Sequence, residues 1–270
     1  MQLASSNPIL ADSALQGAIA HSPAVSTTCT VNGVINKTIG CVLLAVLSGA
    51  IAVPTAKAFP SAIWIAFFVS LGVSILSIFM VRGSPRMAAT VAVLYSAAQG
   101  FMLGALGMVL QTILDAQQIA VPGGIALQAF IIVFGLMIAM LTLFRMGLIT
   151  GGRMFQAGLS MVTLGIGIMF LIGLVMSLFG AQVGFLAFAG AGDQSTTALI
   201  GLGINAVVLV VAALWLIVDF RQIEDAVASG APASIEWYLA FGLIVTLAWV
   251  YLEALKLVFR LAMMFGGRRD

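Results

Sequence analysis

Hydrophobic residues fall into seven long runs along the chain, and short polar connections separate one run from the next. About 20 apolar residues are needed to cross the hydrocarbon core of a bilayer as a helix, and each run reaches or approaches that length. The pattern therefore predicts an all-α integral membrane protein with seven transmembrane helices. The predicted helices cover approximately 38–56, 61–81, 87–113, 126–149, 154–181, 198–219 and 235–262.

The connections are short and rich in Gly, Pro and Ser, as in RGSPR at 82–86 and AVPGG at 120–124. Such residues favour turns, so consecutive helices should lie side by side and antiparallel. We divide the chain into a flexible polar tail (1–37), which lacks the pattern of a signal peptide, a membrane domain (38–262) and a short basic tail (263–270).

Small residues recur within the third run, where Gly100 and Gly104 are followed by Gly107. Glycine lets the backbones of two membrane helices approach closely. A phosphate-binding loop would need a preceding strand and a soluble pocket, neither of which is predicted here. These glycines therefore predict close helix packing.

Composition supports the membrane assignment and narrows the chemistry. Hydrophobic residues make up 62% of the chain and charged residues 7%, and the mean hydropathy is +1.20. The formal net charge is +2 and the basic residues form no patch, so we expect no nucleic-acid partner. Two separated cysteines and one tail histidine, His21, offer no disulfide framework and no histidine-based metal or catalytic site. We expect no cofactor.

The basic residues give an incomplete account of orientation. Arginines lie in the connections after the second, fourth and sixth runs, whereas the connections after the third and fifth contain no Lys or Arg. The positive-inside rule predicts that the arginine-bearing side is cytoplasmic. Arg268 and Arg269 would then lie on the opposite side if all seven runs cross. Either this tail is an exception to the rule, or the last segment re-enters without crossing.

Two carboxylates stand out because of their apolar surroundings. Glu253 lies deep in the last run, and Asp219 follows some twenty mostly apolar residues at the end of the sixth. An ionisable group within the membrane costs several kcal/mol, roughly 2.5–3.5 on insertion scales, so it generally faces protein, water or a counter-ion. The structural alternatives are that Glu253 pairs with Lys256, one turn away, and that Asp219 is the solvated end of a helix.

A polar stripe formed by Thr246, Glu253, Lys256 and Arg260 predicts that the last helix faces protein rather than lipid. Two carboxylates on consecutive helices could share a proton or a cation if they lay at equal depth. Equal depth requires residues 232–241 to lie along the membrane interface, with Trp237 and Tyr238 as anchors. We therefore predict a bend near Gly242, where the inserted part of the helix would start.

The segment DFRQIEDAVASGAPASIEWYLAFGLIVTLAWVYLEALKLVFRLA at 219–262 resembles the C-terminal signature of the Bax inhibitor family, in its bacterial branch, as does SSNPIL at 5–10. The resemblance implies a seven-helix bundle whose last helix is central and wrapped by the first six. It also implies that paired acids on the sixth and seventh helices form a pH-sensitive latch on a calcium leak. Carried over to this sequence, that pair is Asp219 and Glu253, although the family more often has Asp at the second position and a shorter spacing.

These observations lead to one hypothesis of function, a passive cation pathway, with Ca²⁺ as the permeant or weakly bound ion and Asp219 and Glu253 as gate and metal ligands. The family uses an early arginine as counter-charge, for which Arg82 and Arg86 are candidates beside Lys256. Gln99 and Thr246 are candidate cavity-lining residues. The expected setting is the lipid bilayer of the bacterial inner (plasma) membrane.

An alternative from another class is a membrane adaptor that binds a quality-control protease complex in a stress response. It predicts that the N-terminal tail, rather than Glu253, is essential. We do not expect an enzyme, because no intramembrane Ser has a visible base, and an aspartyl protease normally uses two Asp residues.

Overall fold

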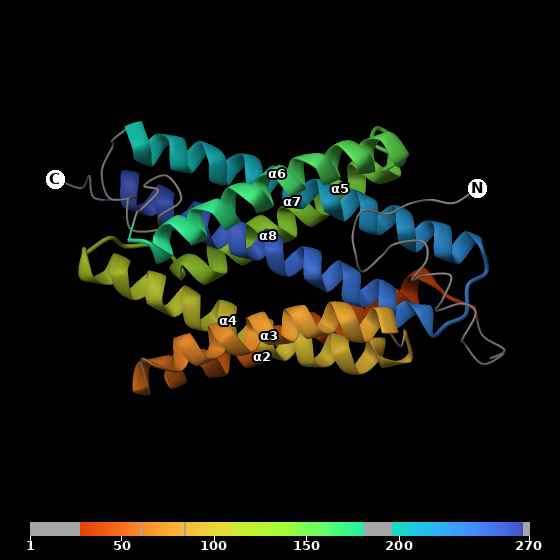
Figure 1. Ribbon diagram of the computed structural model, residues 1–270, viewed down its shortest axis with the longest axis horizontal. Helices are drawn as coiled ribbons and strands as arrows, with labels where there is room; N and C mark the ends of the chain where they lie inside the picture. The colour runs from red at the N-terminus through yellow and green to blue at the C-terminus, as the bar shows by residue number, and fades with distance from the viewer. Residues whose placement is uncertain (1–27, 60, 84, 181–195, 267–270) are drawn as a thin grey trace.

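The computed structural model describes residues 28–59, 61–83, 85–180 and 196–266. Seven long helices and one 3₁₀ turn, η1 (Pro85–Met87), form a single bundle (Figure 1). The helices are α2 (Val31–Ala58), α3 (Ala62–Gly83), α4 (Ala88–Ala116), α5 (Gly124–Arg145), α6 (Arg153–Leu178), α7 (Thr196–Ala228) and α8 (Ile235–Phe265). All seven are long and apolar enough to cross a membrane, which confirms the predicted all-α class and helix count.

The first helix begins earlier than predicted. Thr30 caps α2, because its side-chain hydroxyl accepts a hydrogen bond from the Gly33 amide. Asn32, Asn36 and Lys37 then extend the helix in its polar first turns, which a hydropathy criterion leaves out. Helix α2 therefore includes the last residues of the segment predicted as a tail, and residues 1–27 lie outside the described part of the chain.

Successive helices run in opposite directions, so α2, α4, α6 and α8 begin at one end of the bundle (Figure 1). We call this end the basic end, because Arg86, Arg145 and Arg153 lie there on exposed positions. Helix α8 crosses the bundle from this end to the other. Its 31 residues rise about 46 Å, more than the hydrocarbon thickness. A re-entrant last segment is therefore excluded.

Helix α8 lies at the centre of the bundle, as expected. It packs against α2, α4, α5 and α7. The core around it contains Leu216 of α7 and Leu255 of α8, both fully buried, with Leu114 of α4 and Ile125 of α5. Residues along most of its length are buried, whereas α3, α5 and α6 present mainly apolar side chains outward, as lipid-facing helices do.

The glycines of α4 form a close contact with α2, as the sequence predicts. A Cβ atom on Gly100 would lie 2.2 Å from the Ala45 carbonyl oxygen, and one on Gly104 would lie 2.4 Å from the Gly49 carbonyl oxygen. Ser48 reinforces this contact by donating a hydrogen bond to the Ala97 carbonyl at 2.6 Å. Backbone contact at this distance excludes any larger side chain.

The predicted interfacial segment before Gly242 is wrong. Helix α8 continues without interruption from Ile235, and Tyr238 is only 1% exposed rather than anchored at a membrane surface. Phe241 packs edge-to-face on Tyr95 of α4, with ring centroids 5.4 Å apart. The first turns of α8 therefore belong to the core of the bundle.

Candidate functional site

The two intramembrane carboxylates lie at the α7 and α8 interface but in different surroundings. Asp219 of α7 is 2% exposed, and the polar side chain beside its carboxylate is Thr246 of α8. Neither carboxylate oxygen makes a hydrogen bond to a described residue. A buried charge normally has a counter-charge or hydrogen bonds, because leaving water is otherwise too costly. Asp219 thus presents two buried oxygens able to take a proton or a cation.

Glu253 of α8 is equally buried but fully engaged. Its Oε2 accepts a hydrogen bond of 2.7 Å from Asn205 Nδ2 of α7, and its Oε1 pairs with the ammonium of Lys256. The same Asn205 amide also reaches the Glu253 backbone carbonyl, at 3.2 Å. The ammonium of Lys256 lies 5.2 Å from the ring centroid of Phe170 on α6, a cation–π contact. The structure therefore contains the Glu253–Lys256 ion pair, which the sequence analysis gave as the structural alternative.

Arg260 completes the polar stripe of α8. It is 5% exposed and close enough for the charge of Glu253 to act on it. The group of Glu253, Lys256 and Arg260 carries one negative and two positive charges. A second metal-binding acid is not part of it, and the described residues contain no group of three or more His, Cys, Asp or Glu side chains.

The structure does not bring Asp219 and Glu253 into contact. Thr246, the residue of α8 that lies beside Asp219, is two turns from Glu253, or about 10 Å along the axis of α8. On α7, Asn205 and Asp219 are about 21 Å apart along the axis. No hydrogen bond joins the two carboxylates in the part of the chain that the structure describes, because the Asp219 oxygens have no hydrogen-bond partner there and the Glu253 oxygens bind Asn205 and Lys256. The paired-acid latch stays a prediction.

The other predicted site residues separate into two groups. Thr246 does lie beside Asp219. Gln99 instead donates a hydrogen bond of 2.7 Å to Ser74 Oγ of α3, so it joins two helices away from the acids. Arg86 is exposed on η1 at the basic end, and the side chain of Arg82 lies outside the described residues.

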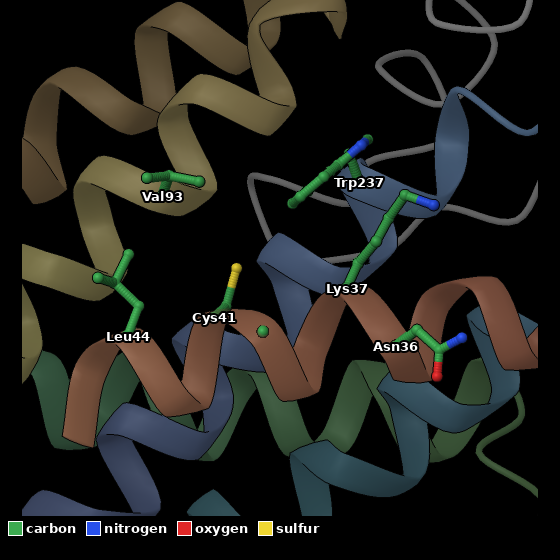
Figure 2. A pocket seen from close by; sticks show the side chains of 7 residues that line it. Asn36, Lys37, Cys41, Leu44, Val93 and Trp237 are labelled. Carbon is green, nitrogen blue, oxygen red and sulfur yellow. The ribbon is translucent and has the colours of Figure 1, made fainter. Parts of the chain in front are cut away.

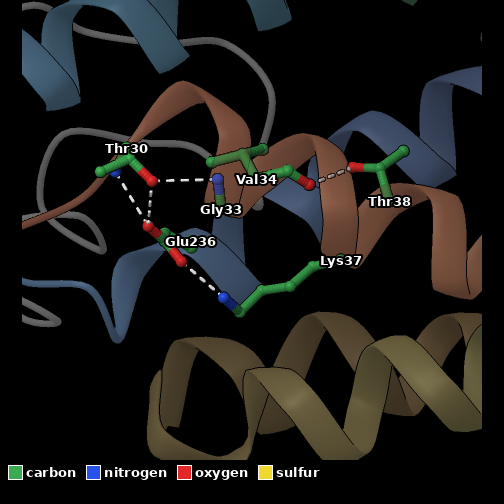
Figure 3. Close-up of polar contacts among 6 residues, drawn as sticks. All are labelled: Thr30, Gly33, Val34, Lys37, Thr38 and Glu236. Carbon is green, nitrogen blue, oxygen red and sulfur yellow. Dashed lines mark hydrogen bonds and ion pairs between the residues drawn. The ribbon is translucent and has the colours of Figure 1, made fainter.

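Sequence reasoning did not single out a third buried acid, Glu236. Glu236 lies in the first turn of α8 and is 5% exposed. Its Oε1 accepts hydrogen bonds from the Thr30 amide (2.8 Å) and the Thr30 hydroxyl (3.0 Å), and its Oε2 pairs with Lys37 (Figure 3). The carboxylate thus lies at the positive N-terminus of α2 and fixes it to α8.

Backbone contacts extend this attachment. The Cys29 amide donates a hydrogen bond of 2.7 Å to the Ala231 carbonyl, and Thr28 forms an isolated antiparallel bridge with Pro232. A Cβ on Gly33 would lie 2.1 Å from the Glu236 carboxylate, so any larger residue at position 33 would displace the carboxylate from its present contacts. We call Thr30, Gly33, Lys37 and Glu236 the α2–α8 clamp. It serves structure and lies at the basic end, away from Asp219 and Glu253.

Asn205 was also missed. An asparagine in the middle of an apolar helix is a readable signal, because a buried amide needs a polar partner. The sequence alone does not identify Glu253 as that partner, since the register of α7 against α8 depends on the packing of both helices.

Comparison with known proteins agrees with the fold. The family model described as Bax inhibitor 1 like matches residues 7–263, nearly the whole chain. No curated protein and no solved structure matches the chain.

Proposed function

Since this chain belongs to the Bax inhibitor 1 like family, we propose that it is a pH-sensitive leak pathway for cations, with Ca²⁺ as the main ion, along the α7 and α8 interface. The observation that carries the proposal is the buried carboxylate of Asp219, which has no well-aligned hydrogen bond among the described residues and has the Thr246 hydroxyl beside it. A membrane protein retains such a group mainly where protons or ions bind or pass.

The two acids act in this proposal at two depths rather than as one latch. Asp219 is the position that takes a proton or a cation. Glu253 is the second position, and Lys256 supplies the positive charge there. Because Lys256 is covalently attached, it competes with any mobile cation for Glu253 and favours the closed state. The burial of both acids supports a closed conformation, in which α7 and α8 must separate slightly before ions pass.

Weak binding suits this role. Ca²⁺ prefers six to eight oxygen ligands, whereas one carboxylate with a neighbouring hydroxyl supplies at most three. Water and backbone carbonyls would have to complete the shell. A site of this kind passes an ion more readily than it stores one.

Protonation of Asp219 removes the negative charge that attracts a cation, so the proposed leak falls as the pH falls. The test is Ca²⁺ entry into vesicles containing the purified protein, measured over a range of pH around neutrality. We expect Asp219→Asn to reduce Ca²⁺ entry and to remove its dependence on pH. Asp115→Asn changes an exposed carboxylate of α4 and is the matched control.

The result that would contradict the proposal is equal Ca²⁺ entry, with an equal pH profile, in the wild type and Asp219→Asn. If deletion of residues 1–27 instead abolished the cellular phenotype while Asp219→Asn had no effect, the adaptor hypothesis would replace this one.

A further inference from the structure

A groove between α2 and α8 opens at the basic end, outside the acid-containing interface. Its volume is about 370 Å³. Asn36, Lys37 and Trp237 line one part of it, and Gly40, Leu44 and Val93 line the other (Figure 2). None of the proposed cation positions borders this groove.

The lining changes from polar to apolar along the helix axis. Asn36 and Lys37 lie in the first two turns of α2, whereas Leu44 is about 11 Å deeper along the same helix. Cys41, also in the lining, is buried and behaves as a small apolar group. The groove therefore has its polar part at the end of the bundle and its apolar part toward the middle, as a phospholipid has.

The polar part offers donors for an anionic headgroup. Lys37 is held in place by Glu236 on one side and by the Trp237 ring, 5.5 Å from the ammonium, on the other. An ammonium has three N–H donors, and its side chain remains 23% exposed. The exposed amide of Asn36 lies next to it in sequence and can also donate. Tryptophan is typical of the headgroup level of a bilayer.

The charge of this end favours an anionic partner. Lys and Arg outnumber Asp and Glu among the described residues of the basic end, because Arg86, Arg145 and Arg153 lie there in addition to the Lys37–Glu236 pair. Glu224 and Asp225, at the end of α7, are already paired with Arg221. Basic residues near a membrane surface attract anionic lipids.

We propose that the groove binds one anionic phospholipid, whose phosphate contacts Lys37 and Asn36 and whose acyl chain lies along Gly40, Leu44 and Val93. The lipid would cover the α2–α8 clamp from the membrane side. It would thereby stabilise the attachment of α2 to the central helix.

Gly40 provides the sharpest test, because a Cβ there meets no atom within 4 Å. Gly40→Leu should fill the groove without disturbing the bundle. Gly135→Leu on α5 is the matched control, since that glycine is equally open and faces away from the groove. Lys37→Gln removes the charge, and Lys37→Arg keeps it.

The experiment counts bound lipids by native mass spectrometry on protein taken from vesicles of phosphatidylcholine with phosphatidylglycerol. We expect the wild type, Gly135→Leu and Lys37→Arg to retain one phosphatidylglycerol. Gly40→Leu should lose it, and Lys37→Gln should retain about fivefold less, the effect of one basic residue at a membrane surface.

Two results would overturn the proposal. One is equal retention of phosphatidylglycerol in the wild type and Gly40→Leu. The other is retention of phosphatidylcholine as strongly as phosphatidylglycerol by the wild type. A stable dimer without bound lipid would assign the groove to a second copy of the chain and would also count against it.

Discussion

Single polar residues determine how the helices of this protein attach to one another, as the α2–α8 clamp shows. The Glu236 carboxylate accepts a hydrogen bond from the Thr30 amide at the N-terminus of α2 and also pairs with Lys37. It occupies space that is free because residue 33 is a glycine. An added methyl group would have to displace a carboxylate that is already bonded on both oxygens.

Gly33→Ala should therefore lower the free energy of unfolding by about 1–3 kcal/mol, as overpacking does. Alanine in a helix would otherwise be favourable relative to glycine. Gly40→Ala is the control, because its Cβ meets open space. Denaturant unfolding in detergent measures both. Equal stability of the two variants would show that the clamp does not hold α2 in place.

Cys29 should react slowly with alkylating reagents at neutral pH. Burial, aided by the charge of Glu236, raises the pKa of the Cys29 thiol to about 11. The thiolate is the reactive form, so the rate of alkylation should increase with pH up to about 11. The measurement uses a Cys41→Ser variant, which leaves Cys29 as the only cysteine. A rate that levels off at the ordinary pKa of a cysteine would contradict the buried position.

At the residue scale, sequence reasoning identified Asp219, Glu253, Lys256 and Arg260 because charges are rare in apolar runs. It gave the pairing of Lys256 with Glu253 as an alternative, and the structure forms that pair because residues three apart lie on one helix face. It could not identify the pairing of Asn205 with Glu253 or of Thr30 with Glu236. Those partners are far apart in sequence and meet only through helix packing.

Whole helices were more predictable than their contacts. Hydropathy located all seven, because crossing the bilayer requires a minimum apolar length. Their ends were less certain, since polar turns at the membrane surface, such as the start of α2, do not differ from a loop in composition. The course of α8 was predicted wrongly, because a bend was inferred only to bring two acids to the same depth.

The contact of α2 with α4 makes a prediction at this scale. Gly104→Ala places a methyl group 2.4 Å from the Gly49 carbonyl oxygen, and backbone atoms cannot move aside as side chains do. We expect the thermal midpoint in detergent to fall, with a loss of about 1–3 kcal/mol.

Gly165→Ala on α6 is the control, because the added Cβ would have no neighbour within 4 Å. A decrease in stability of the same size in both variants would show that close approach of α2 and α4 is not the cause.

At the scale of the whole molecule, the two intramembrane acids lie where α7 meets the central helix α8, Asp219 on α7 and Glu253 on α8, and the clamp lies at the end where α8 begins. Helix α8 packs most extensively against α7, so a small movement of α7 away from it would alter the surroundings of both Asp219 and Glu253 together. The family signature extends through this part of the chain, and the model of the family covers residues 7–263. Architecture was thus predictable from the sequence, whereas the depth of each acid required the structure.

The most direct test of the proposed pathway is the initial rate of Ca²⁺ entry into vesicles that contain Lys256→Met. Removing the attached cation leaves Glu253 with the Asn205 amide and the charge of Arg260 nearby, so a mobile cation can take the place of Lys256. We expect faster Ca²⁺ entry than in the wild type, and we expect the additional change Glu253→Gln to cancel the increase. Lys57→Met, at the end of α2, controls for loss of a positive charge. Unchanged Ca²⁺ entry in correctly folded Lys256→Met would contradict the account.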